Sequence, residues 1–172
     1  MKVLVTGATG FTGGHLAQYL AGRGDEVRAL VRPKSRARFD ASALPKHGVR
    51  ACEGDLTDAG SLGRAMEGVE VVYHIAATYR EAGQPDSAYR AINVEGTRNL
   101  LEVAKAFHVG RVVHCSTGGV HGHIANPPAN EDAPLNPGDV YHGSVPDLRF
   151  EAPVLANSLR DTPHTWTFFS LY

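Results

Sequence analysis

Three glycines, Gly7, Gly10 and Gly13, recur at every third position within the N-terminal segment LVTGATGFTGGHL. An apolar run precedes them and a helical spacing follows, so they lie where a strand turns into a helix. There, the first glycine permits a tight bend, the second lets a pyrophosphate approach the backbone, and the third lets the helix pack against the strand. Unpaired N–H groups at the helix N-terminus favour phosphate oxygens. The segment predicts a dinucleotide-binding loop. Its spacing is G-x-x-G-x-x-G rather than the commoner G-x-G-x-x-G, and the alternative is a glycine-rich turn without a ligand.

The segment after the second apolar run bears on which dinucleotide would bind. NAD-binding domains usually place Asp or Glu at this point, where the carboxylate binds the ribose 2′-hydroxyl. Here the sequence reads ALVRPKSRAR, and no acid appears before Asp40. Guanidinium groups can bind a 2′-phosphate through two hydrogen bonds. The pattern therefore favours NADP over NAD, with a solvated basic loop as the alternative, and the candidate cations are Arg32, Lys34, Arg36 and Arg38.

Strand-like and helix-like segments alternate along most of the chain. We expect strands within residues 2–6, 26–32, 48–56, 69–77 and 110–117, and helices within 13–24, 58–68 and 87–109. Such alternation indicates βαβ units with right-handed crossovers and a parallel sheet. The predicted fold is α/β, a doubly wound parallel sheet with strand order 3-2-1-4-5. His74 and His114 fall inside two of these strands and are expected to be packed, hydrogen-bonded residues.

Composition and charge exclude several classes of function. The chain has 172 residues, 42% of them hydrophobic. Its formal net charge is -1, so it has no excess of positive charge to attract nucleic acid or an anionic membrane. No apolar run is long enough to span a bilayer, and the N-terminus predicts no secretory signal, so we expect a cytoplasmic protein. Cys52 and Cys115 lie in apolar runs and are expected to be buried thiols. The closely spaced histidines of HGH, with no cysteine nearby, predict no metal site.

A set of separate motifs follows in order along the chain: TGATGFTGG, EGDLTD, YHIAA, NVEGTRNLL and HCSTGGVHG. From residue 1 to about Tyr141 they resemble the extended short-chain dehydrogenases/reductases, the NAD-dependent epimerase/dehydratase group. The resemblance implies that the acid of EGDLTD meets the adenine amino group, that the next leucine meets the adenine ring, and that the alanines of YHIAA line the cofactor. With the basic loop included, the expected cofactor-binding residues are Thr6, Gly7, Thr9, Gly10, Phe11, Thr12, Gly13, Arg32, Arg36, Asp55, Leu56, Ala76, Ala77 and Asn93.

The same resemblance implies two catalytic residues. Thr117 would hydrogen-bond the substrate oxygen, and Tyr141 would move the proton as hydride passes to or from the nicotinamide. A free phenol has a pKa near 10, and the family lowers that pKa with a lysine four residues later. Position 145 is Val here, which supplies neither the charge nor a hydrogen bond to the ribose.

We therefore expect an NAD(P)-dependent oxidoreductase or epimerase type of protein that is inactive in this form. Its substrate class would be a hydroxyl- or keto-bearing small molecule such as a nucleotide sugar. The alternatives are a non-catalytic dinucleotide-binding or redox-sensing protein, and a non-functional truncated product.

The C-terminal segment departs from the pattern. We expect residues 1–142 to form a Rossmann domain, and residues 143–172 to be an atypical tail in place of the family's catalytic helix, last strands and substrate domain. The tail has no clear periodicity and contains three prolines, which favours a frameshift near codon 144 or a truncation over a genuine short form. Unless HTWTFFSLY pairs there, Val112 and Val113 would lie at an open sheet edge, which predicts poor solubility or association of copies.

Overall fold

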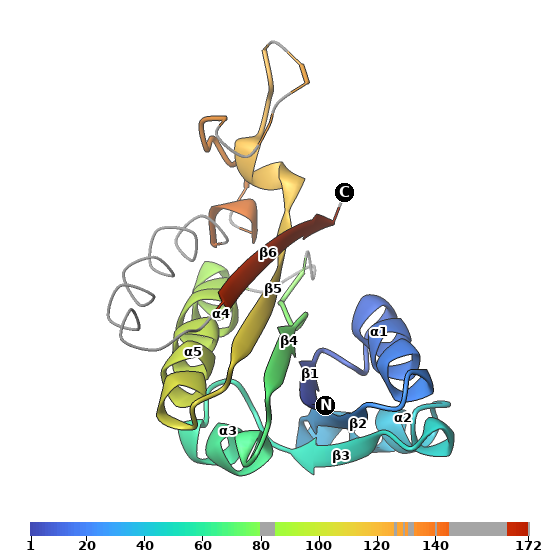
Figure 1. Ribbon diagram of the computed structural model, residues 1–172. Coiled ribbons are helices and arrows are strands. Elements are labelled where there is room, and N and C mark those ends of the chain that lie inside the picture. The colour runs from blue at the N-terminus through green and yellow to red at the C-terminus, as the bar shows by residue number, and fades with distance from the viewer. Residues whose placement is uncertain are drawn as a thin grey trace.

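The computed structural model is built on one parallel sheet (Figure 1). It describes residues 1–79, 85–125, 127–128, 130, 133–139 and 141–144, and the backbone of 165–171. The six strands lie in the order β3-β2-β1-β4-β5-β6. Their bounds are β1 Lys2–Thr6, β2 Glu26–Val31, β3 Arg50–Glu53, β4 Val71–His74, β5 Arg111–Thr117 and β6 Thr165–Leu171. The α/β class and the order of the first five strands confirm the sequence prediction.

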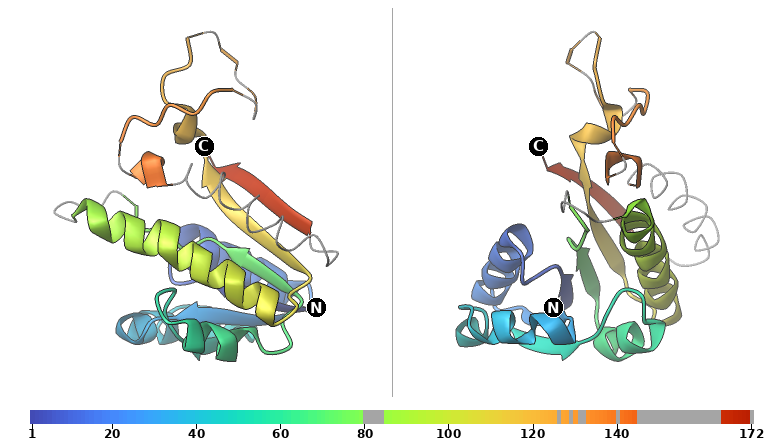
Figure 2. Two further views of the ribbon diagram at one scale, coloured as in Figure 1. Left: turned by 90° about the vertical axis from the view of Figure 1, so that its left-hand side faces the viewer. Right: turned by 180° about the vertical axis from the view of Figure 1, so that it is seen from behind.

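Helices cover both faces of this sheet, as the side and rear views show (Figure 2). Helices α1 (Phe11–Gly22) and α2 (Arg36–Asp40) lie on one face, and α3 (Ala59–Met66) and α5 (Gly96–Ala106) lie on the other. The short α4 (Asp86–Tyr89) and a π-helical segment, Arg90–Glu95, lead into α5. Among the described residues, no helix combines the length and apolar character needed to cross a bilayer.

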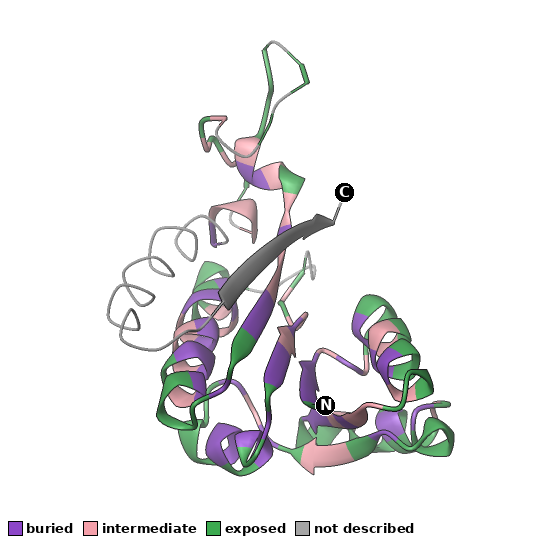
Figure 3. Cartoon of the chain, viewed as in Figure 1, coloured by how far each residue is buried: buried purple, intermediate pink, exposed green. Residues whose placement is uncertain are grey.

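The alternation of side chains along β1 explains why both faces need cover. Val3 and Val5 pack into the core on the side of α1, together with Leu20, whereas Leu4 packs into the core on the side of α3 and α5, together with Leu100. All of these side chains are buried, and Figure 3 shows buried residues concentrated along the central strands. Burying an aliphatic side chain of this size contributes about 1.5–3 kcal/mol to folding. The middle of β1, Val3–Val5, is therefore a continuous apolar run, as is typical of a parallel strand covered on both faces.

The long predicted helix at residues 87–109 is wrong in one respect. The helical hydrogen-bonding pattern is interrupted at Arg90–Glu95, where the chain forms a π-helical turn before α5 begins at Gly96. A π-helical turn adds a residue to the local repeat, and hydrophobic spacing does not register so small a change. The turn adjoins the candidate site described below, because its residue Ile92 lines the cavity.

The β-prone run HTWTFFSLY at the end of the tail pairs with the sheet. Strand β6 pairs in parallel with β5 over seven residue pairs, from Arg111 with Thr165 to Thr117 with Leu171. Val112 and Val113 are accordingly buried in a paired strand and do not form an open edge. A β-prone run can be recognised in the sequence, but its partner strand is distant in the chain. Residues 145–164, including Val145 and the tail prolines, lie outside the described residues, so the frameshift hypothesis stays a prediction.

Candidate dinucleotide site

A cavity of about 530 Å³ opens at the carboxyl ends of the central strands. This edge of an open parallel sheet is where α/β proteins bind ligands, at the point where the strand order reverses. The cavity is lined by the loop after β1, the start of α1, the loops after β2 and β3, and the segment after β4. Of the expected cofactor-binding residues it collects Thr6, Gly7, Thr9, Gly10, Phe11, Thr12, Gly13, Arg32, Asp55, Leu56, Ala76 and Ala77.

The glycine loop is held in a conformation that other residues could not adopt. Gly7 has φ of +71°, and a Cβ added there would lie 2.8 Å from the backbone nitrogen of Ala76. A Cβ on Gly13 would lie 2.3 Å from the carbonyl oxygen of Gly7. The N–H of Gly10 donates to that same Gly7 carbonyl at 2.9 Å and closes the turn. The loop is thus packed backbone against backbone, which requires glycine at both positions.

The N-terminus of α1 faces the cavity without a competing anion. Gly10 is the N-cap, it makes no side-chain capping bond, and the first turn carries no acidic residue. The first N–H groups of a helix have no partner inside the helix, and the helix dipole favours negative charge there. Because Phe11, Thr12 and Gly13 all line the cavity, these donors are available to a phosphate group.

The opposite end of the cavity is shaped by the loop after β3. The Oδ1 atom of Asp55 accepts hydrogen bonds from the N–H and the hydroxyl of Thr57 at 3.0 and 2.9 Å. The backbone N–H of Asp55 donates to Ser61 Oγ at 3.0 Å. A Cβ on Gly54 would lie 2.8 Å from that same Oγ atom. The carboxylate and the neighbouring Leu56 are therefore fixed at the cavity wall, where the resemblance places the adenine.

The basic loop after β2 supplies three of its four cations to the cavity. Arg32, Lys34 and Arg38 line it, and all three are exposed. Arg36 does not: its Nε atom donates to both carboxylate oxygens of Asp40, at 2.9 and 3.0 Å, one helical turn further along. Arg36 is thus outside the cavity lining in this structure, because an acid at i+4 directs its side chain along α2.

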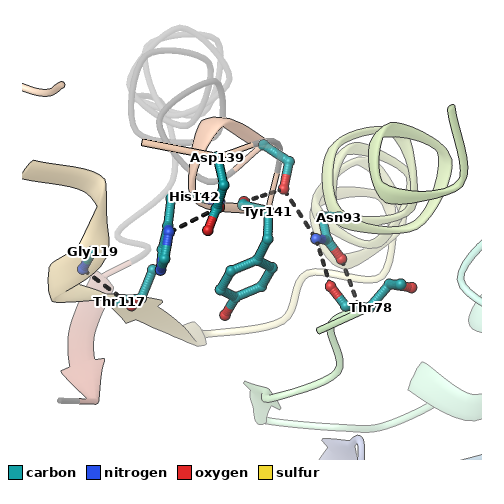
Figure 4. A network of polar contacts seen from close by, with 8 residues as sticks. Thr78, Asn93, Thr117, Gly119, Asp139, Tyr141 and His142 are labelled. Atoms are coloured by element: carbon teal, nitrogen blue, oxygen red, sulfur yellow. Dashed lines mark hydrogen bonds and ion pairs between the residues drawn. The ribbon is translucent and has the colours of Figure 1, made fainter. Parts of the chain in front are cut away.

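Asn93 also lies outside the cavity lining, and its amide instead joins two other segments (Figure 4). Its Oδ1 accepts from the N–H of Thr78 at 2.8 Å, and its Nδ2 donates to the Thr78 carbonyl at 3.1 Å and to Ser144 Oγ at 3.0 Å. Thr78 lines the cavity, and Ser144 ends the helical turn that contains Tyr141. Asn93 therefore positions the site without entering it.

Residues at the start of α5 also hold Leu56 in place at the cavity wall. The Nδ2 group of Asn99 donates to the Leu56 carbonyl at 3.0 Å. A Cβ on Gly96 would lie 2.9 Å from Leu56 Cβ, so α5 approaches this wall closely. The motif NVEGTRN is thus the segment that fixes the loops after β3 and β4 relative to each other.

The two expected catalytic residues are both drawn in Figure 4, in two separate sets of polar contacts near the cavity-lining Thr78. Thr117 ends β5, and its Oγ1 accepts from the N–H of Gly119 at 3.2 Å. A Cβ on Gly119 would lie 2.2 Å from His142 Nε2, so the ring of His142 packs directly over this turn. His142 Nδ1 lies 2.8 Å from Asp139 Oδ1. The Tyr141 ring meets the ring of Tyr79, a cavity residue, edge to face at a centroid distance of 4.9 Å.

Several cavity residues were not anticipated. They are Leu30, Ser35, Gly54, Ile75, Thr78, Tyr79 and Ile92. Most belong to segments next to a recognised motif, so the position relative to a strand end was the available signal. Tyr79 follows YHIAA by two residues, and only the fold places its ring against Tyr141.

The titratable groups beneath the site are held uncharged by burial. Burial lowers the pKa of His114 to about 4, and burial with the neighbouring His114 lowers the pKa of His74 well below its ordinary value. The thiols of Cys52 and Cys115 are free and half-buried rather than fully buried, and burial raises their pKa values. In the part of the chain that the structure describes, no cluster of His, Cys, Asp or Glu could hold a metal ion.

Comparison with known proteins agrees with this geometry. Residues 3–144 match the NAD dependent epimerase/dehydratase family. Sterol demethylase protein B of Methylococcus capsulatus is 40% identical over 144 residues, which cover 82% of this chain and 43% of the relative. The 2-alkyl-3-oxoalkanoate reductase of Stenotrophomonas maltophilia is 36% identical over 127 residues, 74% of this chain and 36% of the relative.

A solved structure extends the comparison to the fold. The dTDP-glucose 4,6-dehydratase of Streptomyces venezuelae, with NAD and TYD bound, superposes with a TM-score of 0.79 at 34% identity and covers 98% of this chain and 54% of that chain. The chain spans less than half the length of the two curated relatives named above. Because the family match extends over most of the sequence, the chain belongs to the NAD-dependent epimerase/dehydratase family.

Proposed function

We propose that this chain binds a nicotinamide dinucleotide in the cavity, and NADP in preference to NAD. The observation that carries the proposal is the backbone packing of Gly7 and Gly13 beside the uncapped N-terminus of α1. That geometry leaves room and N–H donors for a pyrophosphate at the start of α1. The bound NAD of the Streptomyces venezuelae dehydratase supports the same class of ligand here.

The cations at the cavity rim support the preference for NADP. Arg32, Lys34 and Arg38 line the cavity in the loop after β2, and their charges support a place for a 2′-phosphate there. No carboxylate follows β2 before Asp40, and the Asp40 carboxylate is engaged by Arg36. The loop after β2 therefore offers no free carboxylate to accept a hydrogen bond from a ribose 2′-hydroxyl, whereas it offers cations to a 2′-phosphate.

A matched pair of arginine variants tests this preference. In Arg32→Ala, the Kd for NADPH should rise roughly 10- to 100-fold, because a hydrogen bond to a charged group contributes about 1.5–3 kcal/mol. The Kd for NADH should change little. Arg36→Ala removes the same charge four residues away, outside the cavity lining, and should leave both affinities near the wild-type values. Tighter binding of NADH than NADPH by the wild-type chain, or equal effects of the two variants, would refute the preference.

We further propose that the reaction class is oxidoreduction or epimerisation of a hydroxyl- or keto-bearing small molecule. Tyr141 would donate or accept the proton at the substrate oxygen, and the Thr117 hydroxyl would hydrogen-bond that oxygen. The bound nicotinamide would supply the hydride donor or acceptor. The names of the relatives, a 3-oxoalkanoate reductase and a sugar-nucleotide dehydratase, support this substrate class without choosing within it.

Turnover by the chain as given is expected to be negligible. Val145 occupies the position of the family's lysine, so no ammonium group from that position can lower the pKa of Tyr141. Val145→Lys alone should not restore activity, because the following Pro146 opposes the helix that would place the lysine. Loss of NADPH absorbance with a panel of ketones measures this, and robust reduction by the unmodified chain would contradict it. Dinucleotide binding without turnover would favour a non-catalytic binding or sensing function.

A further inference from the structure

A buried histidine beneath the glycine loop joins three segments of the candidate site. His74 is 1% exposed, and both of its ring nitrogens meet threonine hydroxyls. Its Nδ1 lies 2.8 Å from Thr6 Oγ1, and its Nε2 lies 2.8 Å from Thr97 Oγ1. Thr6 ends β1 and leads into the glycine loop, His74 ends β4, and Thr97 lies in the first turn of α5.

The surrounding hydrogen bonds allow one arrangement of protons along this chain. A threonine hydroxyl has one proton to donate. The Thr97 hydroxyl donates its proton to the Asn93 carbonyl at 2.8 Å, so towards His74 it can only accept, and Nε2 must carry a proton. Thr6 Oγ1 accepts from the N–H groups of Ile75 and Ala76, both at 3.1 Å, and its own proton is then free to be donated to His74 Nδ1.

A charged imidazolium would not fit this arrangement. Its Nδ1 would donate to Thr6 Oγ1, which would then have to accept three hydrogen bonds with two lone pairs while its own proton lost its acceptor. The low pKa of His74, caused first by burial and then by the ring of His114, agrees with a neutral ring. The ring is therefore neutral and protonated at Nε2. In the hydrogen-bonded series that links Thr6, His74, Thr97 and the Asn93 carbonyl, both ring nitrogens and both hydroxyls then have partners.

The hydrogen bond between His74 and Thr6 also affects how the glycine loop lies against the segment after β4. The position of a Cβ on Gly7 lies within 3.0 Å of the backbone of Ile75 and Ala76, so the two cavity-lining loops are already in contact. The Thr6 hydroxyl holds these loops together through its bonds to the two N–H groups, and His74 fixes the orientation of that hydroxyl. We propose that His74, itself held by Thr97, is a positioning residue that sets the geometry of the dinucleotide-binding loop. This inference rests on the proposed dinucleotide binding.

Variants at Thr97 test the proposal without touching the cavity lining. Thr97→Val keeps the shape of the side chain but leaves the Nε2–H of His74 without an acceptor, and should raise the Kd for NADPH about tenfold. Thr97→Ser retains the hydroxyl and should restore binding to near the wild-type value. Val109→Ala, a buried substitution outside the cavity lining and the network, should lower the melting temperature without changing the Kd.

The protonation state supplies a readout that a merely structural residue would not give. In a two-bond ¹H–¹⁵N correlation spectrum of the full chain at neutral pH, His74 should show the neutral ring protonated at Nε2, with His74→Asn used to assign its signals. An Nδ1-protonated or charged ring would overturn the proposal, as would a Thr97→Val variant that binds NADPH as tightly as the wild type. If the wild-type chain binds neither NADPH nor NADH, the proposed function fails, and the inference about His74 fails with it.

Discussion

Replacing Gly13 with alanine is expected to lower the affinity for NADPH at least a hundredfold. The new Cβ would lie 2.3 Å from the carbonyl oxygen and 2.6 Å from the carbonyl carbon of Gly7, and 3.0 Å from the nitrogen of Ala8. All three are backbone atoms, so no side chain can move aside. Helix α1 must shift away from the loop, which costs about 1–3 kcal/mol of stability and displaces the N–H donors from the phosphates. Calorimetric titration with NADPH measures the loss.

Gly22, in the same helix, provides the matched control. A Cβ at this position meets nothing within 4 Å, and the residue is exposed in the last turn of α1. Gly22→Ala should raise stability by up to about 1 kcal/mol, through helix propensity and a less disordered unfolded chain, and leave the Kd unchanged. A Gly13→Ala protein that binds NADPH like the Gly22→Ala protein would contradict the assigned role of the glycine loop.

The free energy of unfolding is expected to fall by about 3 kcal/mol between pH 6.5 and 4 because of His114 alone. Its pKa is lowered from 6.5 to about 4 in the folded protein, so in this interval the unfolded chain binds more protons than the folded one. Stability therefore rises with pH through this window and is lost on acidification. His74, whose pKa is also lowered, adds to the loss in the same direction.

Urea unfolding at several pH values measures this dependence. In His114→Phe the slope of the unfolding free energy against pH should decrease by close to one proton between pH 6.5 and 4. The comparison uses slopes, so an overall change in stability from the new ring does not affect it. Parallel curves for the wild type and the variant would show that His114 is not held neutral in the folded state.

The parts of the site that could be predicted from the sequence are those set by local geometry. The turn from β1 into α1 brings stretches of backbone so close together that a Cβ at Gly7 or Gly13 would clash with backbone atoms. Glycine is therefore needed at both positions. Asp55 and Leu56 were assigned in another way, through the resemblance of EGDLTD to a segment of the family, and the structure places both in the cavity lining. The order of the first five strands follows from alternation and the handedness of crossovers.

Other features depended on partners that spacing does not reveal. Arg36 was expected at the cofactor, but Asp40 lies one turn away on the same helix and engages it. Asn93 was expected to bind the cofactor, a role that stays a prediction, and in the structure its amide makes hydrogen bonds with Thr78 and Ser144. The run HTWTFFSLY was recognised as β-prone, but the sequence left its pairing with β5 open, because that contact joins distant parts of the chain.

The central claim is that the glycine-rich end of the sheet binds one nicotinamide dinucleotide. Isothermal titration of the purified chain with NADPH, and separately with NADH, tests this most directly because it needs neither substrate nor turnover. We expect saturable binding at one site per chain, tighter for NADPH than for NADH, and loss of the signal in Gly13→Ala but not in Gly22→Ala. Absence of saturable binding with both dinucleotides, from a chain that melts cooperatively, would contradict the account.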